Sequence, residues 1–245
     1  MNLPRFEGFV RVFVLICIGI FGIEMFLHIP ENGPEFFHNL LRFFGLVPEL
    51  LFKGMIYQLL TWVFFHGNIT HLLFNMLGFW MFGSLLQDYL GHRRFFYFCL
   101  SAAIISGVIV ALAGLFSEVT WSTPTIGASG IVFAILIAVS RLFPDQVVLF
   151  MFIFPMRMQI FALLLIGLEF YALWQSNQGG VSNIAHLGGA LFGWLAISRK
   201  TPPGSFKSSG GFSNWFRTLK DRWHQRKMRR KLRVVRSNEA IKRWN

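Results

Sequence analysis

The sequence predicts an all-α, polytopic membrane protein, a bundle of six transmembrane helices with a long loop between the first two. Composition is the first observation, because 54% of the 245 residues are apolar and 14% are charged, whereas soluble domains contain about a quarter charged residues. The second is that the apolar residues form long runs almost without charge, which is typical of membrane spans. The third is that the net charge of +12 arises from the C-terminal end.

Six apolar segments are expected to cross the membrane. They cover approximately residues 9–29, 69–90, 95–116, 129–143, 158–174 and 184–198. The first leads into bulky residues rather than a small-residue cleavage site, so we expect it to be retained as a span and not removed as a signal peptide. The loop at 30–68 contains two amphipathic pieces, 36–44 and 47–65, which are expected to lie in the membrane interface.

The fourth and sixth segments are shorter than the about 20 residues that a spanning helix needs. Irregular backbone is tolerated at membrane depth only where it lines a watery cavity or is buried in protein. These two segments therefore predict a hydrated cavity above them that opens to the outside.

An even number of spans places both ends of the core on one side of the membrane. That side would hold Arg5, Arg11, Arg93, Arg94, Arg141 and Arg157, whereas the other would hold only Arg42 and Lys53. Cytoplasmic loops carry the excess of Lys and Arg, so both termini are expected to be cytoplasmic. Because no organelle-targeting presequence is evident, the bacterial inner membrane is the expected location.

The basic charge divides the chain into a core, residues 1–198, and a tail, residues 199–245. The core has eight Lys and Arg against nine Asp and Glu, a net charge of −1, and the tail has fifteen against two, a net charge of +13. Residues 201–213 are expected to be a flexible linker, and residues 213–235 a cationic amphipathic helix on anionic lipids. Charge alone also permits nucleic-acid binding, but no motif supports a specific nucleic-acid partner.

Polar residues within spans are the first candidates for function in a membrane protein. One group surrounds His71 and Asn75 in the second span, and the others contain Ser129 and His186 at the start of the fourth and sixth. Counting from each to the charge at the inner end of its span gives twelve or thirteen residues, about 18–20 Å of helix. All three groups are therefore expected at one depth, roughly 10 Å below the outer face of a core about 30 Å thick.

This arrangement predicts a serine nucleophile with a histidine base. A serine hydroxyl is a weak nucleophile that needs an adjacent base, and His186 is expected at the same depth as Ser129. Since no Asp or Glu is close to His186 in the sequence, we expect a pair rather than a triad, with the imidazole oriented by packing or by an aromatic contact. His71 and Asn75 share one helix face and, with the free amides at the start of the fourth helix, are expected to stabilise an oxyanion.

The glycines near these residues are expected to make room for close approach. Gly127 and Gly130 remove bulk beside Ser129. Gly189 and Gly193 form a face of small residues, which allows two membrane helices to pack closely. Such packing is expected to bring His186 within reach of Ser129.

At these residues the chain resembles the rhomboid family of intramembrane proteases. The matching pieces are His66…His71-x-x-x-Asn75-Met76, Gly127-Ala128-Ser129-Gly130 and Ala185-His186-x-x-Gly189-x-x-x-Gly193, in this order. The resemblance implies a first loop that lies partly in the membrane, Ser129 as nucleophile, His186 as base and His71 with Asn75 at the oxyanion site. It also implies that His66 braces the first loop and that neither a metal nor a cofactor is required.

Two positions depart from the family pattern. The chain has Tyr57-Gln58 where the family often shows Trp-Arg, and Gln87-Asp88 where the family often has Glu. The resemblance assigns both positions to structure, so they bear on the stability of the first loop rather than on catalysis.

The expected function is hydrolysis of a peptide bond in a single-span membrane protein, near the outer boundary of the bilayer. Singly, each residue has a plainer interpretation: a serine at a helix start as a cap, and a membrane histidine or a glycine pair as packing. Two other classes remain open, a catalytically inactive relative that binds membrane proteins for quality control and a transporter or channel. For Glu24 and Glu169, a role in a substrate gate or in packing is open.

Overall fold

The computed structural model describes residues 4–27, 33–150, 154–175 and 181–197. From Phe6 onwards, the described residues belong to one compact unit, Phe6–Phe206. The basic tail at 199–245, with its predicted linker and amphipathic helix, lies outside the described residues.

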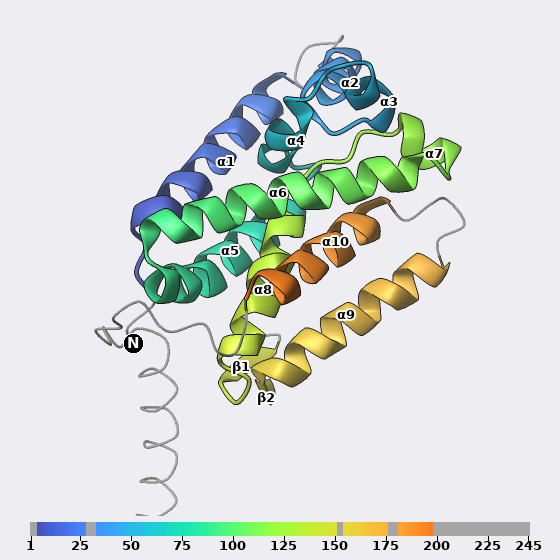
Figure 1. Ribbon diagram of the computed structural model, residues 1–245. Coiled ribbons are helices and arrows are strands. Elements are labelled where there is room, and N and C mark those ends of the chain that lie inside the picture. Colours follow the sequence, from blue (N-terminus) through green and yellow to red (C-terminus); the bar gives the residue numbers. More distant parts are fainter. Residues whose placement is uncertain (1–3, 28–32, 151–153, 176–180, 198–245) are drawn as a thin grey trace, which may run out of the picture. The chain divides into compact units, whose positions relative to one another are not determined.

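Six apolar helices form the body of the described unit (Figure 1). They are α1 (Gly8–Leu27), α5 (Ile69–Leu90), α6 (His92–Gly114), α8 (Ser129–Leu142), α9 (Met158–Gln175) and α10 (Val181–Ala196). Each coincides with a predicted span to within about three residues, so the predicted all-α bundle is confirmed. Among the described helices, α1, α5, α6 and α9 are long and apolar enough to cross a membrane.

The two helices that begin with Ser129 and Val181 are short, as the sequence predicted. Helix α8 has 14 residues and α10 has 16, which corresponds to about 21 and 24 Å of helix. Both lengths fall short of a hydrocarbon core of about 30 Å.

The first loop folds into short helices. These are α2 (Gly33–Phe44), α3 (Pro48–Phe52), α4 (Gln58–Thr61) and the 3₁₀ helix η1 (Trp62–Phe64). Gln58 is fully buried and holds the loop together, since its Nε2 donates to the carbonyl oxygens of Arg42 and Phe43 and its Oε1 accepts from the Val47 amide. Gln87, the other departure from the family pattern, joins α5 to the start of α1 through the Val10 amide and the Glu7 carbonyl.

A small hairpin between α8 and α9 was not predicted. Strand β1 (Val147–Phe150) pairs antiparallel with β2 (Phe154–Arg157), with Val147 opposite Arg157. The four apolar residues of β1 are too few to show whether their sequence pattern is that of a strand or of a helix. Only the pairing of the two segments reveals the strands.

Helix α8 lies at the centre of the bundle, where α5, α6 and α10 pack against it. Its buried residues point in every direction around the helix, as expected for a helix enclosed by others. Helix α10 lies between α6 and α9 (Figure 1). A short helix, α7 (Glu118–Ser122), follows α6 on the way to Ser129.

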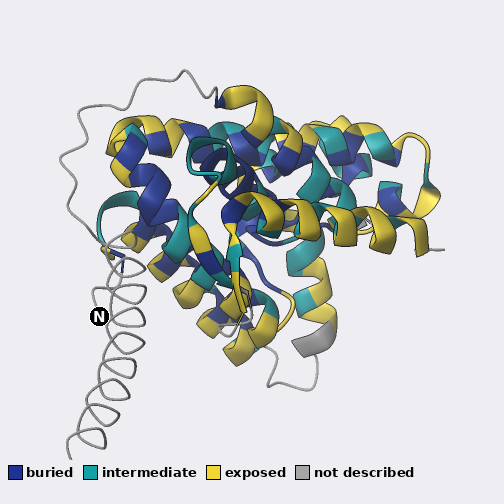
Figure 2. Ribbon diagram, turned by 90° about the horizontal axis from the view of Figure 1, so that it is seen from below, coloured by how far each residue is buried: buried dark blue, intermediate teal, exposed yellow. Residues whose placement is uncertain are grey.

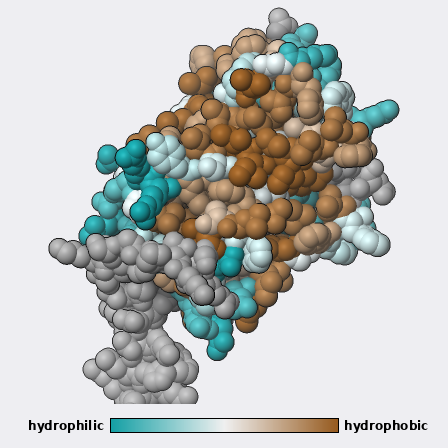
Figure 3. Space-filling view, viewed as in Figure 1, coloured by the Kyte–Doolittle hydropathy of each residue, from teal (hydrophilic) through white to brown (hydrophobic). Residues whose placement is uncertain are grey.

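The outer faces of the helices are exposed and apolar. Figure 2 shows exposed residues along the outward sides of the helices, and Figure 3 shows that apolar residues cover most of the middle of one face. On α9, for example, Leu163 is 62% exposed and Phe170 is 59% exposed. An apolar surface of this extent is suited to lipid and not to water, so the chain is an integral membrane protein.

Candidate active site

Ser129 is the first residue of α8, and the segment before it is fixed to the first loop. Leu46 and Thr125 exchange backbone hydrogen bonds of 2.9 Å, and the Gly127 amide donates to the Trp62 carbonyl at 3.0 Å. The residue at the cap position is Ala128. The capping interpretation of Ser129 is therefore wrong, and its hydroxyl has a different partner.

That partner is His186 in α10. Its Nε2 atom lies 2.6 Å from the Ser129 hydroxyl oxygen, which is a short hydrogen bond. Ser129 is 9% exposed, so the pair is largely withdrawn from the surface. The structure thus brings together the two residues that the sequence analysis singled out as nucleophile and base.

Close packing of α8 and α10 allows His186 to reach the Ser129 hydroxyl. A Cβ atom at Gly189 would overlap the Gly130 carbonyl group, and one at Gly193 would overlap the Ala134 carbonyl group. A Cβ atom at Gly130 would lie 3.1 Å from the Ser106 hydroxyl oxygen in α6 and 3.3 Å from the Ala185 carbonyl oxygen in α10. Only glycine allows the two backbones to approach this closely, as in small-residue faces of membrane helices.

The imidazole of His186 is held between a ring and a carboxylate. Phe133, one turn after Ser129, stacks on it with ring centroids 4.6 Å apart and planes 8° apart. At one edge of the imidazole, Nδ1 lies 2.9 Å from Oε2 of Glu169, and the side chains of both residues are 16% exposed. The amide of Asn183 donates to the same Glu169 oxygen at 2.6 Å.

The carboxylate beside His186 was not expected, because the sequence predicted a serine–histidine pair without an acidic residue. Glu169 is in α9, the helix that precedes α10 in the chain, and it approaches His186 because α9 and α10 pack side by side. No acidic residue near His186 along the chain predicts this partner, because the contact depends on packing between helices. The aromatic contact through Phe133 agrees with the expected orientation by an aromatic ring.

His71 and Asn75 both face Gly127, two residues before Ser129. A Cβ atom on Gly127 would lie 2.7 Å from His71 Nε2 and 3.7 Å from Asn75 Nδ2, and the glycine has a φ of +117° that other residues rarely adopt. Asn75 is 5% exposed, and its Nδ2 has no hydrogen-bond partner among the described residues. A buried donor without an acceptor costs free energy. Such a donor is expected at a site where it binds a group of another molecule.

His66 belongs to the wall of the site. It is 1% exposed, its Nδ1 lies 3.2 Å from the Phe64 carbonyl oxygen, and its ring contacts His71 edge to face at 5.1 Å. It therefore connects the first loop to His71. Among the described residues, no group of three His, Cys, Asp or Glu has the arrangement of a metal site.

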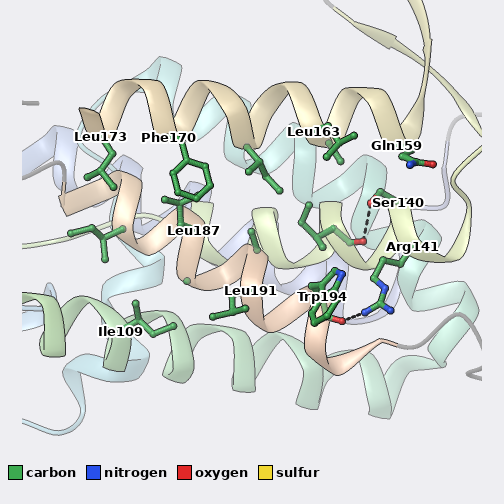
Figure 4. A pocket seen from close by; sticks show the side chains of 16 residues that line it. Ile109, Ser140, Arg141, Gln159, Leu163, Phe170, Leu173, Leu187, Leu191 and Trp194 are labelled. Atoms are coloured by element: carbon green, nitrogen blue, oxygen red, sulfur yellow. Dashed lines mark hydrogen bonds between the residues drawn. The ribbon is translucent and has the colours of Figure 1, made fainter. Parts of the chain in front are cut away.

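A separate groove of about 960 Å³ lies along the outer face of α10, between α6 and α9 (Figure 4). Its walls are apolar, with Leu187 and Leu191 of α10 on one side and Leu163, Phe170 and Leu173 of α9 on the other. Arg141 closes one end, where it contacts the Trp194 carbonyl and ring. Neither Ser129 nor His186 lines this groove, so it is distinct from the candidate active site.

Comparison with known proteins places the chain in a family. Residues 53–200, more than half of the chain, match the Rhomboid domain. The chain is 32% identical over 133 residues to Rhomboid protein 1, mitochondrial, of Saccharomyces cerevisiae, which covers 54% of this chain and 38% of that protein. It is 29% identical over 186 residues to the human Presenilin-associated rhomboid-like protein, mitochondrial, covering 71% of this chain and 45% of that protein.

A bacterial relative extends the comparison. The chain is 28% identical over 194 residues to Rhomboid protease GluP of Bacillus subtilis, covering 79% of this chain and 36% of that protein. The chain thus spans less than half the length of each of these three relatives. The matched domain, the six apolar helices and the relatives together show that this integral membrane protein belongs to the rhomboid family.

Proposed function

We propose that the protein is an intramembrane serine endopeptidase, with Ser129 as nucleophile and His186 as general base. The observation that carries the proposal is the 2.6 Å contact between the Ser129 hydroxyl and His186 Nε2. A nucleophile within hydrogen-bonding reach of its base is the signature of covalent catalysis. The relative named as a protease, GluP, supports the same activity at the level of the family.

Acylation would begin when the Ser129 oxygen attacks the carbonyl carbon of the scissile peptide bond. The hydroxyl proton passes to His186 Nε2 as the new carbon–oxygen bond forms. His186 then gives this proton to the leaving nitrogen, and the carbon–nitrogen bond breaks. A water molecule next attacks the acyl carbon and passes a proton to His186. The bond between this carbon and the Ser129 oxygen then breaks, and His186 returns the proton to that oxygen, which restores the hydroxyl and releases the new carboxyl end.

The oxyanion formed in each step needs hydrogen-bond donors. The amide of Asn75, the ring of His71 and the free backbone amides at the start of α8 are proposed to supply them. Support comes from the position of both side chains against Gly127 and from the buried, unpaired Nδ2 of Asn75. These donors lie on a helix and at a helix start, so they are fixed before substrate arrives.

The proposed substrates are single-span membrane proteins. A regular helix hides its backbone carbonyl groups in hydrogen bonds, so the substrate segment must unwind before Ser129 can attack. Cleavage is therefore proposed at or just within the outer boundary of the bilayer, at a segment with helix-breaking residues. Small residues before the cut would suit a site lined by Gly127 and Gly130.

The location and topology are also proposals. The distribution of Lys and Arg supports cytoplasmic termini and a basic tail, residues 199–245, on anionic lipids. A bacterial inner membrane is the first proposal for the location, and a mitochondrial membrane the second, because two of the relatives carry that word in their names. Fusion of a reporter to the C-terminus, active on one side of the membrane only, tests the topology.

The second candidate function is an inactive relative that binds membrane proteins. One experiment separates the two: the purified protein is treated with a fluorophosphonate probe, which labels activated serines. We expect labelling of the wild type and none of Ser129→Ala or His186→Ala. Ser140→Ala, which removes a hydroxyl bonded within α8 to the Ile137 carbonyl, is the matched control and is expected to be labelled normally.

The outcomes are distinct. Labelling that persists in Ser129→Ala contradicts the assignment of the nucleophile. A folded wild-type protein that is not labelled favours the inactive relative, and cleavage of a panel of single-span proteins in native membranes then gives the second measure of activity.

A further inference from the structure

Glu169 is the charged residue of an otherwise uncharged span. Helix α9 contains no other Asp, Glu, Lys or Arg between Met158 and Gln175. A charged side chain within the membrane is costly and is almost always paired or turned toward a polar site. Glu169 is 16% exposed and lies against His186 and Asn183, so its position is explained by these two partners.

The carboxylate faces the edge of the imidazole that the proposed reaction leaves free. Nε2 faces the Ser129 hydroxyl at 2.6 Å, and a base must present a lone pair there. The proton of the neutral ring is then on Nδ1, which is 2.9 Å from Oε2 of Glu169. The neutral ring therefore presents its N–H edge to a negative charge.

The contact acts through charge more than through hydrogen-bond geometry. Nδ1 makes no well-aligned hydrogen bond in this conformation, although the carboxylate oxygen is within 2.9 Å. When Ser129 gives up its proton, His186 becomes a cation with a carboxylate beside it. The carboxylate at 2.9 Å attracts the positive charge that develops on the ring, which lowers the barrier to proton transfer.

Asn183 fixes the carboxylate from the same helix as His186. It donates to Oε2 at 2.6 Å and stands three residues before His186, so both lie on one face of α10. The Glu169 oxygen that faces Nδ1 is therefore held in place by a second bond. Thermal motion of a long side chain, which would weaken the contact, is restricted by this bond.

We infer that Glu169 is a positioning residue for His186, which selects the tautomer with the proton on Nδ1 and stabilises the imidazolium formed during proton transfer. The inference rests on the proposed function, because it assigns the third member of the same site. The proposed site then contains the catalytic pair, Ser129 of α8 and His186 of α10, and a positioning residue, Glu169 of α9.

The test compares Glu169→Gln, Glu169→Asp and Asn183→Ala by the rate of peptide cleavage in detergent. Gln keeps the size of the side chain and an oxygen for Asn183 but has no charge. We expect Glu169→Gln to lower kcat roughly 10- to 100-fold with little change in KM. This is less than the about 10⁴-fold loss for a fully buried triad aspartate, because Glu169 is not fully buried.

The conservative variant separates positioning from a merely structural role. Glu169→Asp retains the charge at a greater distance and is expected to recover part of the lost kcat. Asn183→Ala, which frees the carboxylate, is expected to fall between the wild type and Glu169→Gln. Gln175→Ala, which removes an exposed polar side chain from the same helix, is the matched control and should keep the wild-type kcat.

Two results overturn the inference: a wild-type kcat in folded Glu169→Gln, or an Asp variant no faster than the Gln variant. If Glu169→Gln does not fold, an Asn183→Ala variant with the wild-type kcat overturns it. If the proposed function is wrong, the folded wild-type protein is not labelled by fluorophosphonate at Ser129. This result distinguishes failure of the proposed function from failure of the inference about Glu169.

Discussion

Gly189 of α10 lies directly against the backbone carbonyl group of Gly130 in α8, one residue after Ser129. The two helices approach so closely that there is no room for a Cβ atom. Because His186 stands one turn before Gly189, the separation of these two backbones sets the distance between the imidazole and the Ser129 hydroxyl.

The substitution Gly189→Ala is expected to push α10 away from α8. A displacement of about 1 Å in a catalytic site costs about 100-fold in rate, so we expect a loss of this order in the rate of fluorophosphonate labelling. Gly167→Ala in α9, where a Cβ atom would meet nothing within 4 Å, is the control. Normal labelling of Gly189→Ala would show that the close approach is not required.

Gly127 combines a left-handed backbone with a contact to His71. Alanine at 127 would be strained at φ +117° and would place its Cβ atom 2.7 Å from His71. We expect Gly127→Ala to reduce kcat at least tenfold, measured by peptide cleavage. Gly54→Ala is the matched control, because Gly54 has a φ of +103° but open space around it. Equal loss of activity in both variants would attribute the effect to backbone strain and not to His71.

Asn75 tests the proposed oxyanion site. Removal of one oxyanion donor typically costs about 10²–10³ in kcat, and we expect Asn75→Ala to fall in this range with a small change in KM. Steady-state cleavage of a peptide substrate measures both constants. Phe74→Ala, at an adjacent position that is 60% exposed, should keep its kcat. A kcat within twofold of the wild type for Asn75→Ala would exclude Asn75 as a donor.

The stack between Phe133 and His186 is expected to contribute to the orientation of the imidazole. Aromatic pairs contribute about 0.5–1.5 kcal/mol beyond their buried area, so loss of the ring in Phe133→Leu should lower kcat by about 2- to 10-fold. Phe133→Tyr keeps the ring and should retain most of the activity. A Phe133→Tyr variant that is as slow as Phe133→Leu, at equal thermal stability, would contradict a role of the ring in orienting His186.

Gln58 is expected to stabilise the first loop and not to act in catalysis. Gln58→Ala leaves the Arg42 and Phe43 carbonyl groups and the Val47 amide without this partner, and a buried unpaired group costs about 1–3 kcal/mol. Thermal unfolding in detergent should show a lower midpoint, whereas kcat below that temperature should change little. Gln159→Ala, at an exposed position, should leave the midpoint unchanged. An unchanged midpoint in Gln58→Ala would contradict this role.

The spans were predictable because each apolar run ends at polar or charged residues. Helix α5 has the predicted bounds, Ile69–Leu90, and the short fourth and sixth helices were expected from the lengths of their apolar runs. Helix length along the chain fixes depth in a membrane, so the common depth of these two side chains followed from counting residues.

The same residue count in α9 places Glu169 at this depth. From Arg157 to Glu169 is twelve residues, about 18 Å of helix, which is the depth assigned to Ser129. The sequence signal for a shared depth was therefore present. It gives no direction around the helix axis, however, and cannot distinguish a carboxylate that faces His186 from one that faces another helix.

The sequence by itself determined the class of the protein, its spans and the residues that carry chemistry, because hydrophobicity and helical rise act along one chain. Only the tertiary structure decided which side chains meet: Glu169 with His186, Phe133 with the same ring, and Gly189 with the Gly130 carbonyl. These contacts depend on the rotation and separation of helices that are distant in sequence. Packing of all their faces together sets both quantities.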